Sequence, residues 1–413
     1  MKKGFYAVIF AQFFSSLADN ALLIATIALL IELASPDWMH PLLKLFFTAS
    51  YVLLAPFVGA FADAMPKGRA MFLGNLIKIV GGVLAFVGVH PLLAYGLVGL
   101  GAAAYSPAKY GILTELLPPS QLVAANGWIE GTSVSSIILG TMLGGVLITP
   151  MAWGFLGSVL PYVTSPAQAA LVVVSLLYAI AAILNLRIPN TGIRYRQRGF
   201  HPVVMMRMFW MANQRLWTDK LGQISLSVTT LFWGAGATLQ FIVLRWAEFQ
   251  LGMTLDEAAI LQGVVAIGIA VGALAAAKMI RLEDSCRVLI LGALMGLFVP
   301  GMIFVFNTYV AIALLAFIGM LAGFFVVPMN ALLQHRGHVT LSAGWSIAVQ
   351  NFNENLNVLF MLAIYAGLLH FNVPINTVIV IFGACVAVAM LLVIVWYRKN
   401  QKAYDLQSLI QTH

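Results

Sequence analysis

The sequence predicts an all-α integral membrane protein with twelve transmembrane helices in two six-helix halves, and three observations lead to this fold class. First, 62% of the 413 residues are hydrophobic and only 9% are charged, whereas a soluble domain carries about 25% charged residues to cover its surface. Second, the chain divides into apolar stretches long enough to cross a bilayer. Third, a short sequence pattern recurs at equivalent places in the two halves.

The same composition excludes several other classes of protein. Two cysteines are too few for a secreted disulfide framework, and we interpret Cys286 and Cys385 as free thiols. The apolar content is too high for a disordered chain. The alternating ten-residue segments of a β-barrel are also absent.

The first half contains six predicted spans, separated by charged residues, proline or glycine. Each supplies the roughly 20 apolar residues that a spanning helix needs. They are residues 5–33, 43–64, 70–89, 92–113, 122–148 and 168–186. The first span follows Lys2 and Lys3 as a signal peptide would, but it is longer than a signal-peptide core of about 7 to 15 residues and contains Asp19. We therefore expect an uncleaved first helix.

A long polar interruption, residues 187–220, divides the halves. Its second part, from residue 201 onward, mixes large apolar residues with arginines, which is typical of a helix lying in the membrane interface near anionic headgroups. We expect a connector helix there, and a lipid-sensing role is the alternative. The predicted domains are residues 1–187, a basic linker at 188–221, and residues 222–413. The basic residues of the interruption are Arg187, Arg194, Arg196, Arg198, Arg207, Arg215 and Lys220.

The second half contains six further spans by the same criteria. They are residues 226–246, 258–280, 288–306, 309–333, 342–369 and 374–397. With both chain ends placed in the cytoplasm, nearly all basic residues fall on the cytoplasmic side, and only Lys44 falls outside. This asymmetry follows the positive-inside rule. We therefore expect cytoplasmic termini, and the net charge of +8 records topology and not nucleic-acid binding.

Two motifs predict how the helices are arranged. LVAANGW at 122–128, after Pro107, is echoed by LSAGW at 341–345, after Pro328. A parallel repeat of two six-helix halves is the arrangement of the major facilitator superfamily, in which substrate binds at mid-membrane between two halves that rock. The loop after the second span also resembles the cytoplasmic Gly-Asp-Gly-Arg signature of that superfamily, with a longer spacing. Its residues are Gly59, Asp63, Lys67, Gly68 and Arg69.

Charged side chains inside the spans are the candidate functional residues, because an ionised group at the bilayer centre costs about 2.5 to 3.5 kcal/mol even on the lenient scale. Asp19 lies on a polar stripe of the first span that includes Gln12, Ser15, Ser16 and Asn20. Glu354 lies on a second stripe, in the eleventh span. That stripe includes Ser346, Gln350, Asn353 and Asn357.

Each candidate has a structural alternative. Lys78 in the third span is expected either to face a polar cavity or to extend along lipid with its ammonium at the interface. The polar stripes are also the pattern of interhelical hydrogen bonding. Glu130 is either a cavity residue or a local hydrogen-bond partner in a glycine-rich helix. The glycines at 140, 144, 145, 268 and 272 indicate close helix packing, or else a seam open to lipid.

No enzyme motif accounts for these residues. Ser106 and Lys109 spell the S-x-x-K of serine hydrolases, but the accompanying S-D-N and K-T-G elements are missing. H-E-x-x-H, G-x-S-x-G and the P-loop are missing as well. We therefore expect a protein that is not an enzyme and that uses no metal or cofactor.

Five segments are similar to the bacterial lysophospholipid transporter family of the major facilitator superfamily, and the likeness runs through almost the whole chain. They are residues 11–23 (AQFFSSLADNALL), 102–116 (AAAYSPAKYGILTEL), 231–239 (LFWGAGATL), 323–337 (GFFVVPMNALLQHRG) and 349–355 (VQNFNEN). The resemblance implies flipping of lysophospholipids, chiefly 2-acyl-glycerophosphoethanolamine, to the cytoplasmic leaflet of the bacterial inner membrane by facilitated diffusion. It also implies a functional link to a cytoplasmic acyltransferase/acyl-ACP synthetase that restores the second chain. Partners otherwise are membrane lipids, and we expect a monomer.

The resemblance also implies which charges matter: Asp19 with Asn20, Lys109 and Glu354. The seventh span differs from the family, because Gln240 stands where relatives place an arginine. Arg245 follows five residues later, which turns a helix by about 140° and aims it elsewhere. The candidate substrate-binding or gating residues are Asp19, Asn20, Tyr105, Lys109, Gln240, Arg245, Gln350, Asn351 and Glu354, with Gln12, Ser16, Lys78, Glu130 and Asn357 as a second group.

Three functional hypotheses follow. In the first, Asp19 and Glu354 attract the ammonium of a lysolipid head and Lys109 its phosphate, while glycine-lined seams admit the acyl tail; the same charges are alternatively gates between two states. The second is a proton-coupled carrier of a small amphipath, because intramembrane carboxylates serve as proton relays. The third, a membrane-embedded lipid hydrolase or acyltransferase, lacks a catalytic constellation.

Overall fold

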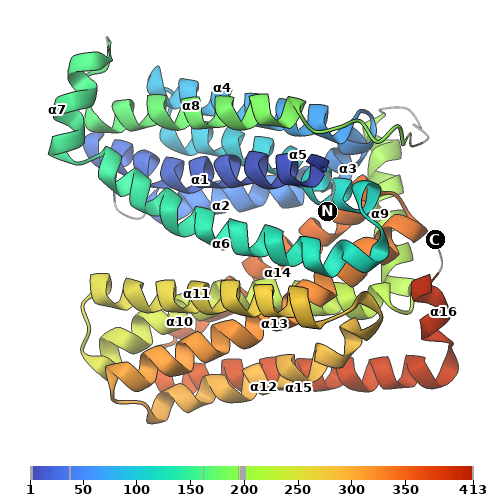
Figure 1. The fold of residues 1–413 in the computed structure, drawn as a ribbon. Coiled ribbons are helices and arrows are strands. Elements are labelled where there is room, and N and C mark those ends of the chain that lie inside the picture. Colours follow the sequence, from blue (N-terminus) through green and yellow to red (C-terminus); the bar gives the residue numbers. More distant parts are fainter. Residues whose placement is uncertain (1–2, 37–38, 161, 194, 196–200, 412–413) are drawn as a thin grey trace. The chain divides into compact units, whose positions relative to one another are not determined.

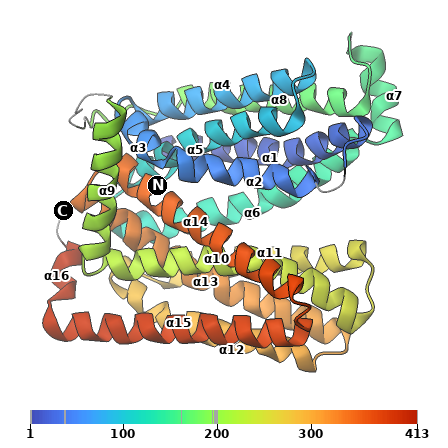
Figure 2. The same cartoon turned by 180° about the vertical axis from the view of Figure 1, so that it is seen from behind.

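The structure is a computed structural model that describes residues 3–36, 39–160, 162–193, 195 and 201–411, and within these ranges all regular structure is helical (Figures 1 and 2). The chain separates into two compact units. Unit 1 comprises Met1–Leu117, Ser135–Met211 and Ser342–Asn351, and unit 2 comprises Pro118–Val134, Ala212–Leu341 and Phe352–His413. These units group residues by packing, and the division of the sequence into two halves stays a prediction.

Unit 1 holds most of the first half of the chain. Its core lies between α1, α4, α5 and α8, where α4 packs along both α5 and α8, and α1 packs along α8. Close approach depends on glycine: a Cβ on Gly101 of α5 would lie 2.7 Å from the carbonyl oxygen of Gly74 on α4. The helices that begin in unit 1 are α1 (Lys3–Glu32), α2 (Met39–Leu53), α3 (Ala55–Asp63), α4 (Lys67–Phe86), α5 (Pro91–Leu116), α7 (Pro150–Val159), α8 (Pro166–Leu186), α9 (Pro202–Thr218) and α14 (Ala343–His370).

Unit 2 holds most of the second half. The closest pair of helices is α11 and α13, where side chains at Gly268 or Gly272 would collide with backbone atoms of α13, and side chains at Gly319 or Gly323 with backbone atoms of α11. Such spacing of small residues lets helix backbones approach in a membrane. The helices that begin in unit 2 are η1 (Pro119–Gln121), α6 (Leu122–Leu147), α10 (Gly222–Leu251), α11 (Leu255–Met279), η2 (Leu282–Val288), α12 (Leu289–Phe298), η3 (Val299–Phe304), α13 (Thr308–Thr340), α15 (Ile375–Ala403) and α16 (Leu406–Gln411).

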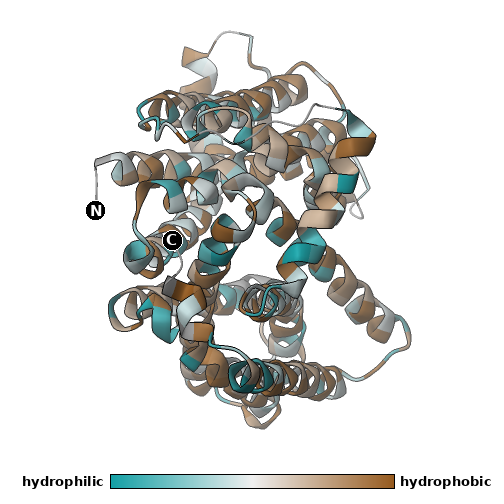
Figure 3. Cartoon of the chain, turned by 90° about the vertical axis from the view of Figure 1, so that its right-hand side faces the viewer, coloured by the Kyte–Doolittle hydropathy of each residue, from teal (hydrophilic) through white to brown (hydrophobic). Residues whose placement is uncertain are grey.

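The helices have the length and composition of membrane spans. Within the described residues, 10 helices are long and apolar enough to cross a membrane, or up to 11 if the bent pair α2 and α3 is one span. Figure 3 shows hydrophobic residues along most of the long helices. The remaining predicted span, the fourth, at residues 92–113, corresponds to α5, a helix of 26 residues whose glycine, tyrosine, serine and proline residues lower its hydropathy. The predicted fold class is confirmed.

The structure corrects several details of the predicted elements. The second span is bent by 65° between Leu53 and Ala55, because Pro56 begins a new helix and lacks the N–H needed to continue the first. The ninth span starts earlier than predicted and combines η2, α12 and η3 over Leu282–Phe304. The helices α7 and α16 are too short to leave a span-length pattern, and the sequence analysis missed them.

The connector helix expected after residue 201 is α9. Three arginines of the predicted basic linker, Arg194, Arg196 and Arg198, lie outside the described residues. So does Lys2 of the positively charged N-terminus.

Candidate functional site

An ion pair lies inside unit 1, between the polar stripe of α1 and the middle of α4. The ammonium of Lys78 lies 2.8 Å from both carboxylate oxygens of Asp19. Tyr178 on α8 donates its hydroxyl hydrogen to the same carboxylate at 2.7 Å. The side chain of Lys78 is 1% exposed and that of Asp19 is 22% exposed. The carboxylate is thus the accessible member of the pair.

Further groups surround the buried ammonium of Lys78. It donates to the hydroxyl of Ser15 at 3.0 Å, and Ser15 in turn donates to the side-chain oxygen of Asn75 at 2.7 Å. The ring centroids of Tyr105 and Tyr178 lie 5.1 and 5.4 Å from the Lys78 nitrogen, within cation–π range. These contacts compensate the loss of hydration, so the structure favours a buried Lys78 over one that extends along lipid.

Two members of this cluster were missed by the sequence analysis. Asn75 precedes Lys78 by about one turn, so it projects from the same face of α4. This spacing would have been enough to predict that Asn75 lies near Lys78. Tyr178 lies in a span without charged residues, where an aromatic residue is normally a packing residue. Only the packing of α8 on α1 brings its hydroxyl to Asp19.

The other candidates in unit 1 lie along α1, α5 and the start of α14. Asn351 donates its amide to the hydroxyl of Ser106 at 2.9 Å. Asn20 donates to the backbone oxygen of Ser16, one turn earlier on α1, at 2.8 Å. The ammonium of Lys109 lies 4.2 Å from the ring centroid of Tyr110. The buried candidates of this group are Gln12, Tyr105, Gln350 and Asn351.

In unit 2, the candidates lie on α6, α10 and α14. Glu130 and Glu354 are both buried, each 7% exposed. Gln240 donates to Gln262 on α11 at 2.8 Å, and Arg245 is exposed. Asn357 donates to the backbone oxygen of Thr230 on α10 at 2.8 Å, so for this stripe residue the interhelical hydrogen bond expected as an alternative is present.

The loop motif after the second span forms a second polar cluster in unit 1. Asp63 accepts hydrogen bonds from the ammonium of Lys67 at 2.5 Å, the hydroxyl of Ser342 at 2.5 Å and the backbone N–H of Gly344 at 2.9 Å. The last of these is an N–H near the start of α14, where a helix favours a negative charge. Gly59 contributes by its small size, because a Cβ there would lie 3.1 Å from Cα of Trp345.

The same cluster extends to Glu115 at the end of α5. Its carboxylate lies 3.5 Å from the ammonium of Lys67 and accepts from the hydroxyls of Thr191 at 2.7 Å and Tyr195 at 3.0 Å. Burial, and after it the negative charges of Glu115 and Asp63, raise the pKa of Tyr195 above its ordinary value. The phenol therefore stays protonated and keeps donating. Glu115 thus ties the segment after α8 to the ends of α4 and α5.

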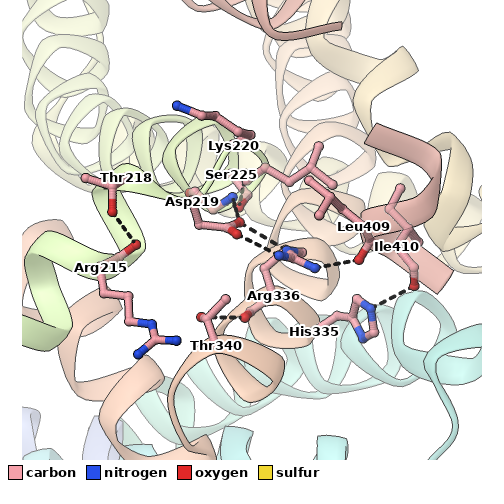
Figure 4. Close-up of polar contacts among 12 residues, drawn as sticks. Arg215, Thr218, Asp219, Lys220, Ser225, His335, Arg336, Thr340, Leu409 and Ile410 are labelled. Atoms are coloured by element: carbon pink, nitrogen blue, oxygen red, sulfur yellow. Dashed lines mark hydrogen bonds and ion pairs between the residues drawn. The ribbon is translucent and has the colours of Figure 1, made fainter. Parts of the chain in front are cut away.

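Unit 2 contains a second cluster of this kind, whose central residue is an arginine instead of a glutamate (Figure 4). Arg336 at the end of α13 forms two hydrogen bonds with Asp219, at 3.0 and 2.6 Å, and donates to the backbone oxygen of Leu409 at 2.5 Å. The neighbouring His335 ring lies 2.9 Å from the backbone oxygen of Ile410. Asp219 also accepts from the backbone N–H of Gly222, at the start of α10.

These two arrangements follow the sequence repeat. Glu115 and Arg336 each lie about two turns beyond the helix proline of their half, Pro107 or Pro328. Each then holds the segment that follows the last span of its half. Glu115 and Asp219 were not among the predicted site residues, although the repeat aligns Glu115 with Arg336.

Two glycines of α6, Gly140 and Gly144, pack closely against α1. A Cβ on Gly140 would lie 3.0 Å from Cβ of Asn20, and one on Gly144 would lie 2.9 Å from the carbonyl oxygen of Ala21, both on α1. By contrast, nothing lies within 4 Å of a Cβ built on Gly145. Of the two readings of these glycines, packing is the one that the structure favours at Gly140 and Gly144.

Comparison with known proteins decides the family. Residues 8–352 match the sequence profile of the Major Facilitator Superfamily. The chain is 44% identical over 400 residues to the lysophospholipid transporter LplT of Shigella flexneri, which covers 96% of this chain and 97% of that protein. This chain belongs to the lysophospholipid transporter family of the major facilitator superfamily. A second member of the family, LplT of Yersinia enterocolitica, is 44% identical over 377 residues, which are 91% of this chain and 89% of that protein.

Solved structures agree with this fold. The transporter FucP in the outward conformation superposes with a TM-score of 0.73 at 12% identity, over 96% of this chain and 98% of that one. A bacterial homologue of the iron transporter ferroportin, in an outward-facing state, gives 0.73 at 13% identity, over 97% and 100%. The human organic anion transporter MFSD10 gives 0.70 at 14% identity, over the same shares. At these identities the likeness establishes the fold of this lysophospholipid transporter family member and not a substrate.

The chemistry available at the site is electrostatic. No group of three or more histidine, cysteine, aspartate or glutamate residues among the described residues is placed to hold a metal ion. What the described residues offer in unit 1 is a buried cation with an accessible carboxylate beside it, lined by tyrosine and small polar side chains. Such a site is suited to binding a zwitterionic ligand, which carries one positive and one negative group.

Proposed function

We propose that this protein is a lysophospholipid transporter, which moves 2-acyl-glycerophosphoethanolamine and related single-chain phospholipids to the cytoplasmic leaflet by alternating access. The observation that carries the proposal is the 44% identity, over 96% of the chain, to a protein named for that activity. The match extends over nearly the full length of both proteins.

The Asp19–Lys78 pair is the proposed contact with the headgroup. A phosphoethanolamine head is a zwitterion, so it can exchange into an existing ion pair with its ammonium on the carboxylate and its phosphate toward the lysine. Asp19 is the accessible partner and makes the first contact. Lys78 is already desolvated, which strengthens its attraction for a phosphate that enters the same low-dielectric environment.

The remaining intramembrane candidates complete the proposed pathway. Lys109 is a second positive charge for the phosphate, and Glu354 is a second negative charge for the ammonium. Glu130, Gln240 and Arg245 are further candidates for binding or gating. Alternating access requires the substrate to bind the two states with different affinities, because a ligand shifts such an equilibrium only through that difference.

The cellular setting belongs to the same proposal. The distribution of basic residues supports cytoplasmic termini in a bacterial inner membrane. A transported lysolipid has one free glycerol hydroxyl, so a cytoplasmic acyltransferase/acyl-ACP synthetase is the enzyme class that would use it. We propose a monomer that moves its lipid without chemical change.

The test is uptake of labelled lysophosphatidylethanolamine into proteoliposomes, with and without a proton gradient. We expect gradient-independent uptake, lost in Asp19→Asn and kept in Glu283→Gln, a matched carboxylate control with a 54% exposed side chain. Mass spectrometry of the recovered lipid should return it unchanged. A folded preparation that gives no uptake above protein-free liposomes would refute the proposal, and uptake that depends on the gradient would favour the proton-coupled carrier.

A further inference from the structure

The short helix α7, between α6 and α8, is exposed without being a span. Its 10 residues include no buried one. Exposed fractions reach 88% for Met151, 68% for Phe155 and 58% for Val159. Successive members of this set are four residues apart, so they form one apolar stripe along the helix. We call Met151, Phe155 and Val159 the α7 stripe.

The other faces of α7 differ from the stripe. Leu156 packs against the buried core of unit 1, so the helix is held by one side. The flank between these two sides carries Gly154, Gly157 and Ser158, all exposed. The ring of Trp153 lies against Gly157, 3.3 Å from the position of a Cβ there. The helix therefore has a packed side, an apolar stripe and a flank without charge, and contact with lipid would remove the exposed apolar surface from water.

Short tethers keep α7 at the membrane boundary. Only residues 148–149 separate it from α6, and residues 160–165 separate it from α8. Because an extended chain advances at most about 3.3 to 3.6 Å per residue, the helix cannot move far from the ends of these two candidate spans. The segment is also uncharged: no aspartate, glutamate, lysine or arginine occurs between Glu130 and Arg187.

The position of α7 identifies which membrane face it meets. Glu32 at the end of α1 accepts from the backbone N–H of Ala167, so the start of α8 lies at the same end of unit 1 as the end of α1. The opposite end of α8 leads to Thr191, which binds Glu115. Thus α7 lies at the face opposite the cluster of Asp63, Lys67 and Glu115. The equivalent connection in the second half, between α14 and α15, holds no helix.

We propose that α7 is an interfacial helix whose stripe inserts into the lipid leaflet at that opposite face. The occupant of the stripe is lipid acyl chain, because an uncharged apolar face at a membrane boundary has no feature that a polar or charged partner would recognise. Insertion anchors the outer end of unit 1 in one leaflet. We identify that leaflet as the outer one, from which a lysolipid is collected, and this identification rests on the proposed function. The insertion of the stripe into lipid does not depend on the proposed function.

The experiment places a spin label on the full-length protein in vesicles of phosphatidylethanolamine and phosphatidylglycerol. The background is Cys286→Ser with Cys385→Ser, which removes both natural thiols. Phe155→Cys and Met151→Cys report the stripe. Leu392→Cys, on an exposed position of α15, is the lipid reference, and Glu283→Cys is the aqueous reference.

The readout is collision of each label with oxygen, which concentrates in lipid, and with a nickel chelate, which stays in water. We expect labels at Phe155 and Met151 to lose most nickel collisions and to match Leu392. Nickel access at both positions equal to that at Glu283 would overturn the proposal and place α7 in water. Because the measurement uses no substrate, its failure is distinguishable from failure of the transport assay.

Discussion

Neutralising Asp19 alone should destabilise this protein more than neutralising both members of its ion pair. In wild type the ammonium of Lys78 lies 2.8 Å from both carboxylate oxygens; Asp19→Asn removes their negative charge and one acceptor oxygen, while the Lys78 side chain stays 1% exposed. Removing one partner of a buried pair costs roughly 3 to 5 kcal/mol. The Ser15 hydroxyl and two tyrosine rings remain as partners, so we expect the lower end, about 3 kcal/mol.

The double variant Asp19→Asn with Lys78→Met is the control. It removes the stranded charge and leaves an amide oxygen to accept from Tyr178, so stability should recover by about 2 kcal/mol. The assay is equilibrium unfolding in one detergent, comparing the free energies of unfolding of wild type, both single variants and the double variant. A double variant no more stable than Asp19→Asn would refute the electrostatic reasoning, as would an Asp19→Asn protein as stable as wild type.

Three further predictions concern packing and the two polar clusters. Gly144→Ala should lower the unfolding temperature, because its Cβ would lie 2.9 Å from a backbone oxygen. Gly145→Ala has nothing within 4 Å of its Cβ and should raise the free energy of unfolding by up to about 1 kcal/mol through helix propensity. Equal changes in unfolding temperature for the two variants would contradict the packing. Asp63→Asn should weaken the bond to Lys67 and slow lysolipid uptake while the protein stays folded, and unchanged uptake would remove this cluster from the transport cycle. Deleting residues 406–413 should cost about 1 to 3 kcal/mol by leaving buried Arg336 without one acceptor, and unchanged thermal unfolding would show that this contact is dispensable.

The membrane class and the approximate spans were predictable because they depend on local composition. A segment of about 20 apolar residues crosses a bilayer largely regardless of the rest of the chain. The bend between Leu53 and Ala55 was harder to predict from the sequence. The sequence shows the proline at 56, but a helix can either kink at a proline or end there. The short helices α7 and α16 left no signal of span length.

The candidate site was predictable in its residues and not in its pairing. Asp19 and Lys78 stood out because charges are costly in hydrocarbon. Their contact joins α1 to α4, and the rotation of each helix about its own axis decides which side chains meet. An isolated span pattern does not contain that rotation, so Lys78 remained equally compatible with lipid.

The sequence alone determined that this chain is a helical membrane protein of two repeats with charges placed inside its spans, because the cost of exposing polar groups to hydrocarbon acts on each segment separately. Tertiary structure decided which charges neutralise one another, which of two adjacent glycines, Gly144 or Gly145, permits helix contact, and that Tyr178 completes the Asp19 site. These outcomes depend on distances of a few ångströms between helices remote in sequence, where packing and electrostatics are settled together.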